Sequence, residues 1–292
     1  MTAKRYRTSS QVRFNLKLYL DREFVNDGQY INVESGHFAV NGQRADVLTE
    51  VNPRRYASSY TEWVGDTDHD GCDPYPTIVA SGVTIDGQFH ERGSAPYFPQ
   101  INYENGEVIF GVDVPANSTV ETTFSAKRTT FDFPDSDVAN LLYTSIKDNV
   151  DFATTTIPSG IERQLPLVII DDQSRSSVPY QLGGGQILNQ SVILHVIANN
   201  PVERDQICDL LQDEKFRKVI QGVDFNVAPQ RFSQTGDRAS TYVSYTDMQA
   251  SGALAWSRMY VDTATIREKS TFRGYHNARV DWNLTIYRLP GT

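Results

Sequence analysis

The acidic run Asp66–Gly71, with the sequence DTDHDG, is the segment of this chain most similar to a metal site. Asp66, Asp68 and Asp70 stand at alternate positions before a glycine, as the first oxygen ligands of a calcium loop do. The twelfth position, however, is Thr77, where such a loop needs a bidentate glutamate. We therefore expect a solvated acidic loop, with a calcium site as the alternative, and predict no metal.

His195 and Cys208 are residue types that could form a base and a nucleophile. No third group that would orient them is evident, so we expect a buried imidazole and a buried thiol instead. Asp171 and Asp172 could supply paired carboxylates, but neighbours along a strand point in opposite directions, and a solvated turn is the simpler interpretation. The sequence therefore predicts no catalytic residue and no cofactor.

A strand followed by a helix, within Gln186–Gly222, is the clearest structural element and must position both His195 and Cys208. The β-branched run Ser191–Ala198 is typical of a strand covered on both faces. Asn200 then precedes a proline, which suits an N-cap before the first helical residue. The helix is expected to continue to a C-terminal glycine, with an apolar stripe formed by Ile207, Leu210, Leu211, Val219 and Ile220 before Gly222.

Composition narrows the class of protein. A chain of 292 residues with 39% hydrophobic and 22% charged residues suits a soluble protein of two domains. No apolar run approaches the roughly 20 residues that span a bilayer, so no membrane association is expected. Only Cys72 and Cys208 are present, which indicates synthesis in a reducing cytosol, and the N-terminus does not look like a secretory signal. The net charge of −9 argues against coating of nucleic acid.

We place a domain boundary near residues 130–136, which gives a β-rich domain over 1–132 and an α+β domain over 133–292. Short runs separated by turn dipeptides predict a β-sandwich or small barrel in the first domain. The second domain should hold about two helices and a mainly antiparallel sheet. Strands are expected at 13–20, 36–40, 78–85, 107–114, 119–126, 165–170, 223–227, 240–246, 255–265 and 278–289, and a further helix at 137–148.

The second half of the chain resembles the tail-terminator and neck proteins of tailed bacteriophages. The resemblance rests on SVILHVIANNPVERDQICDLL and on the closing strand ARVDWNLTIYRL; in the first half, VTIDGQF and INYENGEVIFGVDVPANSTVETTFSAK resemble β-rich parts of other virion proteins. The chain is longer than many tail terminators, so the terminator, stopper and adaptor roles stay open.

That resemblance implies a non-enzymatic virion protein, made in the host bacterial cytoplasm, that forms a ring at the head–tail junction. A hexamer or dodecamer would contact the portal or connector and the tail proteins, and DNA would pass through its lumen without sequence-specific binding. Gly183–Gly185 and Gln230–Arg238 are candidate arms for contacts between subunits.

Two other hypotheses stay open. A tail or capsid-decoration protein could bind carbohydrate or a receptor through aromatic loops of the β-rich domain, at Tyr56, Tyr60, Trp63 and Tyr75. A hydrolase built on His195, Cys208 or Asp171 is the third.

Overall fold

Two compact units make up the chain, and each combines segments that are distant in the sequence. Unit 1 comprises residues 1–23, 129–228 and 246–292, and unit 2 comprises 24–128 and 229–245. A computed structural model describes residues 8–39, 42–66, 76–134, 165–179, 185–213, 219–233, 236–272 and 275–288. The units thus differ from the two continuous halves that the sequence suggested, because an N-terminal and an internal segment each join the other half.

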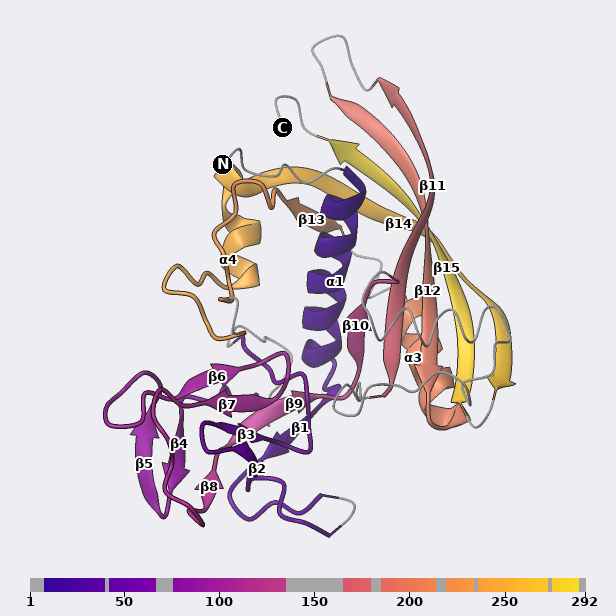
Figure 1. Cartoon of the computed structure of the whole chain (residues 1–292). Coiled ribbons are helices and arrows are strands. Elements are labelled where there is room, and N and C mark those ends of the chain that lie inside the picture. Colours follow the sequence, from indigo (N-terminus) through magenta and orange to yellow (C-terminus); the bar gives the residue numbers. More distant parts are fainter. Residues whose placement is uncertain are drawn as a thin grey trace. The chain divides into compact units, whose positions relative to one another are not determined.

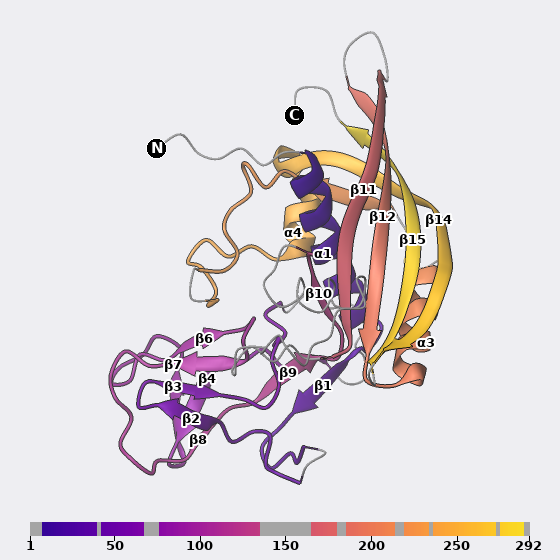
Figure 2. The ribbon, with the colours of Figure 1, turned by 45° about the vertical axis from the view of Figure 1, so that its right-hand side comes forward.

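Unit 1 is built around a six-stranded sheet with the order β10-β11-β12-β15-β14-β13 (Figure 1). The β10–β11 pair is parallel and the other pairs are antiparallel. The four long central strands lie side by side in both views (Figures 1 and 2). The strands are β10 (Thr130–Asp132), β11 (Leu167–Pro179), β12 (Gln186–Ala198), β13 (Ile220–Val223), β14 (Ala255–Phe272) and β15 (Tyr275–Arg288).

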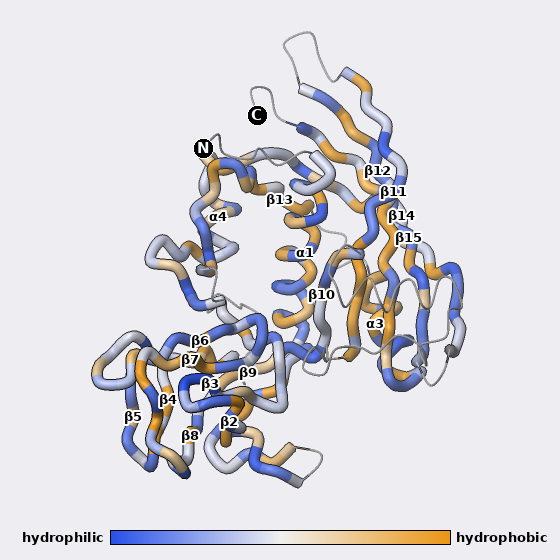
Figure 3. Tube along the Cα trace, viewed as in Figure 1, coloured by the Kyte–Doolittle hydropathy of each residue, from blue (hydrophilic) through white to orange (hydrophobic). Residues whose placement is uncertain are grey.

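One face of this sheet, which we call the inner face, carries most of the apolar side chains of the sheet. Val192 pairs with Trp282 and Leu194 with Val280, and all four side chains are buried. The alternation predicted for the last strand is confirmed, because Ala278, Val280, Trp282, Leu284 and Ile286 are buried at every second position. Hydrophobic colours gather where β11 and β12 pass α3 (Figure 3).

Helix α3 (Pro201–Gln212) packs on the inner face, where the Trp282 indole N–H donates to the Leu211 carbonyl at 3.0 Å. Its N-cap is confirmed, since the Asn200 side chain accepts from the Glu203 amide at 2.8 Å. The predicted continuation of the helix to Gly222 is wrong. Ile220 is buried and pairs with Met259 in a strand, so its apolar side chain serves the sheet and not a helix stripe.

Helix α1 (Thr8–Asn26) stands where a strand was predicted at 13–20, and that prediction is wrong. Its buried apolar residues Val12, Leu16 and Leu20 recur every four residues, the period of a helix. The stripe is hard to see in the sequence because two polar residues, Gln11 and Asn15, lie on the same buried face.

Both polar side chains hydrogen-bond to the edge of the sheet. Asn15 accepts from the Val223 amide at 2.7 Å and donates to the Val223 carbonyl at 3.0 Å. Gln11 donates to Asp224 and accepts from the amide of Phe225. These bonds satisfy both the buried amides and the backbone of an edge strand, which would otherwise cost free energy.

Helix α1 also reaches the opposite edge of the sheet. Arg13 lies 3.1 Å from Asp172, the register partner of Val192, so α1 and α3 face the same side of the sheet. The Lys17 ammonium donates to the carbonyl of Phe131 in β10. The sheet therefore curves around α1, which contacts both of its edges.

Of the other elements predicted in the second half, some are confirmed and some are wrong. The strands expected at 165–170, 255–265 and 278–289 are confirmed and are longer than expected. Those at 223–227 and 240–246 are wrong, because turns follow β13 and a short helix, α4 (Tyr245–Ala250), stands at the second place. The helix expected at 137–148 lies outside the described residues.

Unit 2 consists of short strands in three small sheets, with the orders β1-β9, β2-β3-β7-β6 and β5-β4-β8. Its core includes Trp63 stacked on Phe124, with ring centroids 4.0 Å apart. The strands are β1 (Tyr30–Val33), β2 (Thr49–Asn52), β3 (Arg55–Ala57), β4 (Gly82–Ile85), β5 (Gln88–Glu91), β6 (Gln100–Asn102), β7 (Glu107–Ile109), β8 (Val120–Glu121) and β9 (Phe124–Lys127).

Several strands of unit 2 are shorter than predicted. The expected strand at 119–126 is two strands, and those at 78–85 and 107–114 reduce to β4 and β7. At 36–40 only Phe38, in the described part, forms an isolated bridge. The turn at Asp86-Gly87 is confirmed, with φ of 48° and 83° between β4 and β5. The whole protein is thus mostly β with few helices, broadly an α+β protein.

Candidate functional site

The face of the sheet opposite α3 and α1, which we call the outer face, is apolar and buried at Leu167, Ile169 and Ile197 and becomes polar over the middle of β12, β15 and β14. Asn189 and Thr285 are register partners there, and the Thr285 hydroxyl is within 2.6 Å of the Asp262 carboxylate and 3.2 Å of the Asn189 side-chain oxygen. A second row runs parallel to it. The Ser191 hydroxyl donates to Asn283 at 3.0 Å, and Asn283 donates to Thr263 at 2.8 Å. The rows cross three neighbouring strands.

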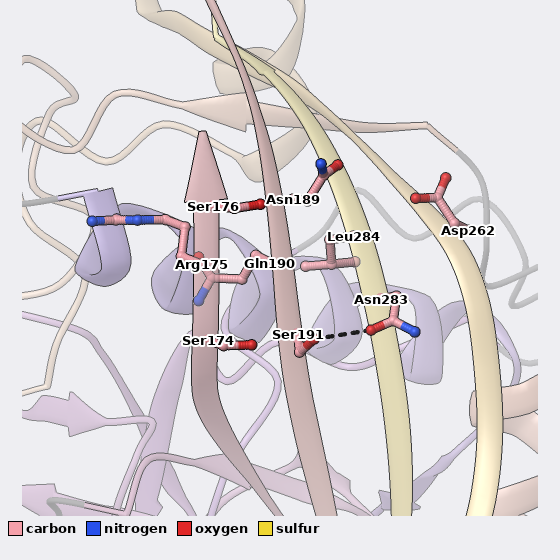
Figure 4. Close-up of a pocket in the computed structure, with 9 residues that line it drawn as sticks. All are labelled: Ser174, Arg175, Ser176, Asn189, Gln190, Ser191, Asp262, Asn283 and Leu284. Atoms are coloured by element: carbon pink, nitrogen blue, oxygen red, sulfur yellow. Dashed lines mark hydrogen bonds between the residues drawn. The ribbon is translucent and has the colours of Figure 1, made fainter. Parts of the chain in front are cut away.

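These rows surround a shallow hollow of about 370 Å³. Figure 4 looks onto the outer face: the side chains of Ser174, Ser176 and Asn283 lie over the strands, and α1 lies behind the sheet. The hollow is lined by Ser174, Arg175, Ser176, Asn189, Gln190, Ser191, Asp262, Asn283 and Leu284. Short polar side chains that already bond one another form a flat contact surface and not an enclosed pocket for a small molecule.

An aromatic pair borders the polar rows. Tyr260 is the register partner of Thr285, so it shares the outer face, and its ring meets that of Tyr287 edge to face at 5.5 Å. Both rings are only partly buried. Tyrosine combines a large apolar ring with a polar hydroxyl, and for that reason it is enriched in protein interfaces.

The sheet has open edges on both sides. β10 pairs with β11 only at Leu167–Ile169, and β13 pairs with β14 only over Ala255–Met259. In the described part of the chain, no strand pairs with the rest of either edge. Unpaired amides and carbonyls of an edge strand are a template for pairing with another chain. The outer face and these edges are the candidate functional site.

The structure separates His195 from Cys208. His195 pairs with Arg279 on the outer face, whereas Cys208 is buried in α3, which packs on the inner face. Burial raises the pKa of the Cys208 thiol to about 11, so the thiolate is scarce at neutral pH. The two side chains therefore cannot act as a nucleophile and its base, which agrees with the predicted burial of the thiol.

The paired carboxylates are separated in the same way. Asp171 pairs with Ile193 on the outer face and accepts a hydrogen bond from Gln173, while Asp172 points to the inner face and meets Arg13. The two acids thus point in opposite directions, as expected for neighbours in a strand. They lie in a strand, however, and not in the solvated turn that we expected.

In unit 2, Asp66 has a structural role. Its carboxylate meets Arg231 at 2.5 Å and accepts from the amide of Tyr245 at 3.2 Å, and both charged side chains are nearly buried. An aspartate engaged in this way is a poor first ligand for calcium, which needs its ligand oxygens available. Asp68 and Asp70 lie outside the described residues.

The segment 229–245, predicted to contain an arm at Gln230–Arg238, is held within unit 2. The Tyr242 ring contacts two guanidinium groups, whose central carbons lie 5.3 Å (Arg231) and 4.6 Å (Arg238) from the ring centroid. The Tyr242 hydroxyl donates to the Gly65 carbonyl at 3.1 Å, and burial raises the pKa of Tyr242 to about 12. We name Asp66, Arg231, Arg238 and Tyr242 the clasp. The described part of this segment is thus fastened to its own unit.

The aromatic residues proposed for ligand binding belong mostly to the core. Tyr56 and Trp63 are 2% and 1% exposed, and Tyr60 packs against the same core. Tyr75 lies outside the described residues, as do Gly183 and Gly184 of the glycine run. Buried rings cannot stack on a sugar, so this motive for carbohydrate binding does not hold at Tyr56 and Trp63.

Sequence reasoning missed the polar rows of the outer face. The alternation of Arg279, Asp281, Asn283 and Thr285 indicated a solvated face of the last strand. The neighbours of these residues on other strands depend on the register between strands, and a single sequence does not show that register.

Neither a family model nor a curated protein matches this chain. No described helix is long and apolar enough to span a membrane. Within the described ranges, no cluster of three or more histidine, cysteine or acidic side chains could hold a metal ion.

Proposed function

We propose that this protein is a non-enzymatic structural subunit of a bacteriophage virion that forms a ring at the head–tail junction, as a neck, connector or tail-terminator protein. The ring joins the portal complex of the capsid to the tail and lets DNA pass. One observation carries the proposal: the sheet of unit 1 presents polar rows around a shallow hollow, beside edges that no described strand pairs with.

A ring subunit needs two different contact surfaces, because a head-to-tail contact that closes by rotation joins unlike patches. The sheet of unit 1 supplies two unlike edges, one on β11 and one on β14. Its outer face combines tyrosines with short polar side chains, a composition suited to a wet protein contact. The separation of His195 from Cys208 supports a role without covalent catalysis by that pair.

Unit 2 would supply a second surface for contacts with other proteins of the particle. Its three small antiparallel sheets around one core support a sandwich-like or barrel-like domain, the arrangement that the sequence predicted. The net charge of −9 suits a lumen that repels DNA phosphates and so does not retain the passing duplex.

A tail or decoration protein that binds a receptor or carbohydrate is the second candidate. Phe89 and Phe98 favour it, because they are 58% and 47% exposed on unit 2. Phe98 also has a φ of 50°, an unusual conformation for a bulky side chain and one that is often found at binding sites. A glycan array with the F89A/F98A variant as a control tests this candidate, and an absence of binding by the unaltered protein counts against it.

Labelling of virions tests the leading proposal. Gold-conjugated antibodies against the protein should mark the head–tail junction of the phage that encodes it, and mass spectrometry of purified particles should detect the chain. Absence from purified virions would contradict the proposal, and label confined to the capsid surface or tail fibres would favour the second candidate.

A further inference from the structure

We propose that neighbouring copies pair through their sheets, with the open edge of β11 in one copy adding antiparallel to the open edge of β14 in the next. This inference rests on the proposed ring and names the contact that closes it. The occupant of each edge is therefore a second copy of this chain. The two edges lie on opposite sides of one sheet, so the contact is head to tail.

Strand direction favours this arrangement. β11, β12, β15 and β14 alternate in direction, since each neighbouring pair is antiparallel. β11 and β14 therefore run in opposite directions. A second copy placed in the plane of the sheet continues the alternation, and its backbone groups meet an edge that no described strand pairs with.

The β11 edge is poorly protected against such pairing. Beyond Asp172 its only charged residue is Arg175, its only proline is the last residue, Pro179, and Val178 is 50% exposed. Isolated edge strands usually carry several charges, prolines or bulges that discourage pairing. β11 has one bulge, between Asp172 and Arg175, whereas β14 has two.

Side chains of the outer face select one register. Asp171, Ser176 and Val178 of β11 share this face, because their partners in β12 are Ile193, Asn189 and Ile187. On β14, Tyr260 pairs with Thr285, Asp262 accepts from Thr285, and Arg267 contacts Asp281, so these three share the same face.

The two sets have matching spacing. Along β11, Ser176 follows Asp171 by five residues and Val178 follows Ser176 by two. Along β14, which runs the other way, Asp262 precedes Arg267 by five residues and Tyr260 precedes Asp262 by two. Each strand has a bulge in this stretch, which lets an odd spacing keep both ends on one face. The resulting pairs are a carboxylate with a guanidinium, a hydroxyl with a carboxylate, and an aliphatic side chain with an aromatic ring, all of which stabilise neighbouring strands.

A designed disulfide tests this register. In a C72S background, S176C and D262C in one chain should form disulfide-linked oligomers under mild oxidation. The two positions cannot bridge within one copy, because three strand spacings separate them, roughly 14 Å, whereas a disulfide needs Cα atoms within about 7 Å. The matched control is S176C with N283C, since Asn283 lies in the interior strand β15 and should not cross-link.

A charge exchange tests the same contact without cysteines. D171K and R267E should each weaken association roughly tenfold, measured by sedimentation, and the double variant D171K/R267E should recover most of the loss. D209K, an exposed change on α3, is the control and should leave association unchanged. Melting curves confirm that each variant is folded.

The outcomes separate this inference from the proposed function. A ring that persists in D171K and R267E and never cross-links through S176C/D262C overturns the edge pairing but leaves the ring. Cross-linking by S176C alone also overturns it, because that result indicates a two-fold β11–β11 contact. A wild-type protein that is monomeric and absent from virions overturns both.

Discussion

The two units solve the packing of β-structure in different ways. Unit 1 uses strands of up to 18 residues in one sheet, whose inner face is apolar and whose outer face carries polar rows beside edges that no described strand pairs with. Unit 2 uses strands of two to four residues in three small sheets around an aromatic core, with a clasp of arginines and a tyrosine. The long strands therefore offer surface for contacts, whereas the short strands leave little edge for another chain.

Because of this difference, the residues that stabilise unit 1 are separate from those proposed to make its contacts, whereas the clasp of unit 2 serves stability. In unit 1 the inner face and α3 hold the fold, so the polar rows of the outer face can be changed without unfolding it. In unit 2 the clasp is part of the stability of the unit.

Replacement of Trp282 by alanine should be the most damaging change in unit 1. The side chain is 0% exposed and its N–H bonds α3, so Trp282→Ala should lower the free energy of unfolding by about 3–5 kcal/mol. Thr285→Ala, on the outer face of the same strand, should cost about 1 kcal/mol or less. Chemical denaturation followed by circular dichroism measures both, and equal losses would contradict the assignment of the two faces.

The clasp should respond strongly to loss of a single charge. Arg231→Ala removes the partner of the nearly buried Asp66 carboxylate and should cost about 3 kcal/mol. Arg54→Ala is the matched control, because Arg54 and Asp113 form an exposed pair that should contribute less than about 1 kcal/mol. If the two variants unfold at the same denaturant concentration, Asp66 is not held as described.

Loss of the helix cap should have a moderate effect. Asn200→Ala removes the acceptor for the Glu203 amide at the start of α3 and should cost about 1 kcal/mol. Asn200→Ser keeps an acceptor and should restore most of that loss. A thermal melt distinguishes them, and an alanine variant as stable as the original would show that the cap contributes nothing.

At neutral pH the smallest change is expected for Tyr242→Phe, whose main effect appears in alkali. Burial raises the pKa of Tyr242 to about 12, above the value near 10 of an unfolded tyrosine. The neutral form is favoured in the folded protein, so the contribution is complete below pH 10 and is lost as the pH rises towards 12. The stability difference between wild type and Tyr242→Phe should therefore shrink over that range, and a difference that does not vary with pH would contradict the assignment.

The strand–helix unit at β12 and α3 was predictable because its signals are local. A β-branched run, an N-cap asparagine and a proline act within a few residues, and β15 showed its alternation for the same reason. Helix α1 was not predictable in this way, since the partners of the buried Gln11 and Asn15 come from β13 and the residues just after it, more than 200 positions away. The prediction that α3 continues to Gly222 failed for the same reason, because Ile220 packs as part of the sheet and not of the helix.

The candidate site shows the same limit. That Asn283 and Thr285 face solvent follows from alternation in one strand, but their contacts with Ser191 and Asp262 follow from register between strands. The open edges also depend on how far β10 and β13 extend, which the sequence alone did not indicate. The tertiary partners, and not the residue types, make this surface a candidate for assembly.

Electron microscopy of the purified protein tests whether it forms the proposed ring. We expect closed rings with rotational symmetry and a central opening, in which neighbouring subunits meet at the edges of the unit 1 sheet. Monomers or two-fold dimers at every protein and salt concentration would contradict it.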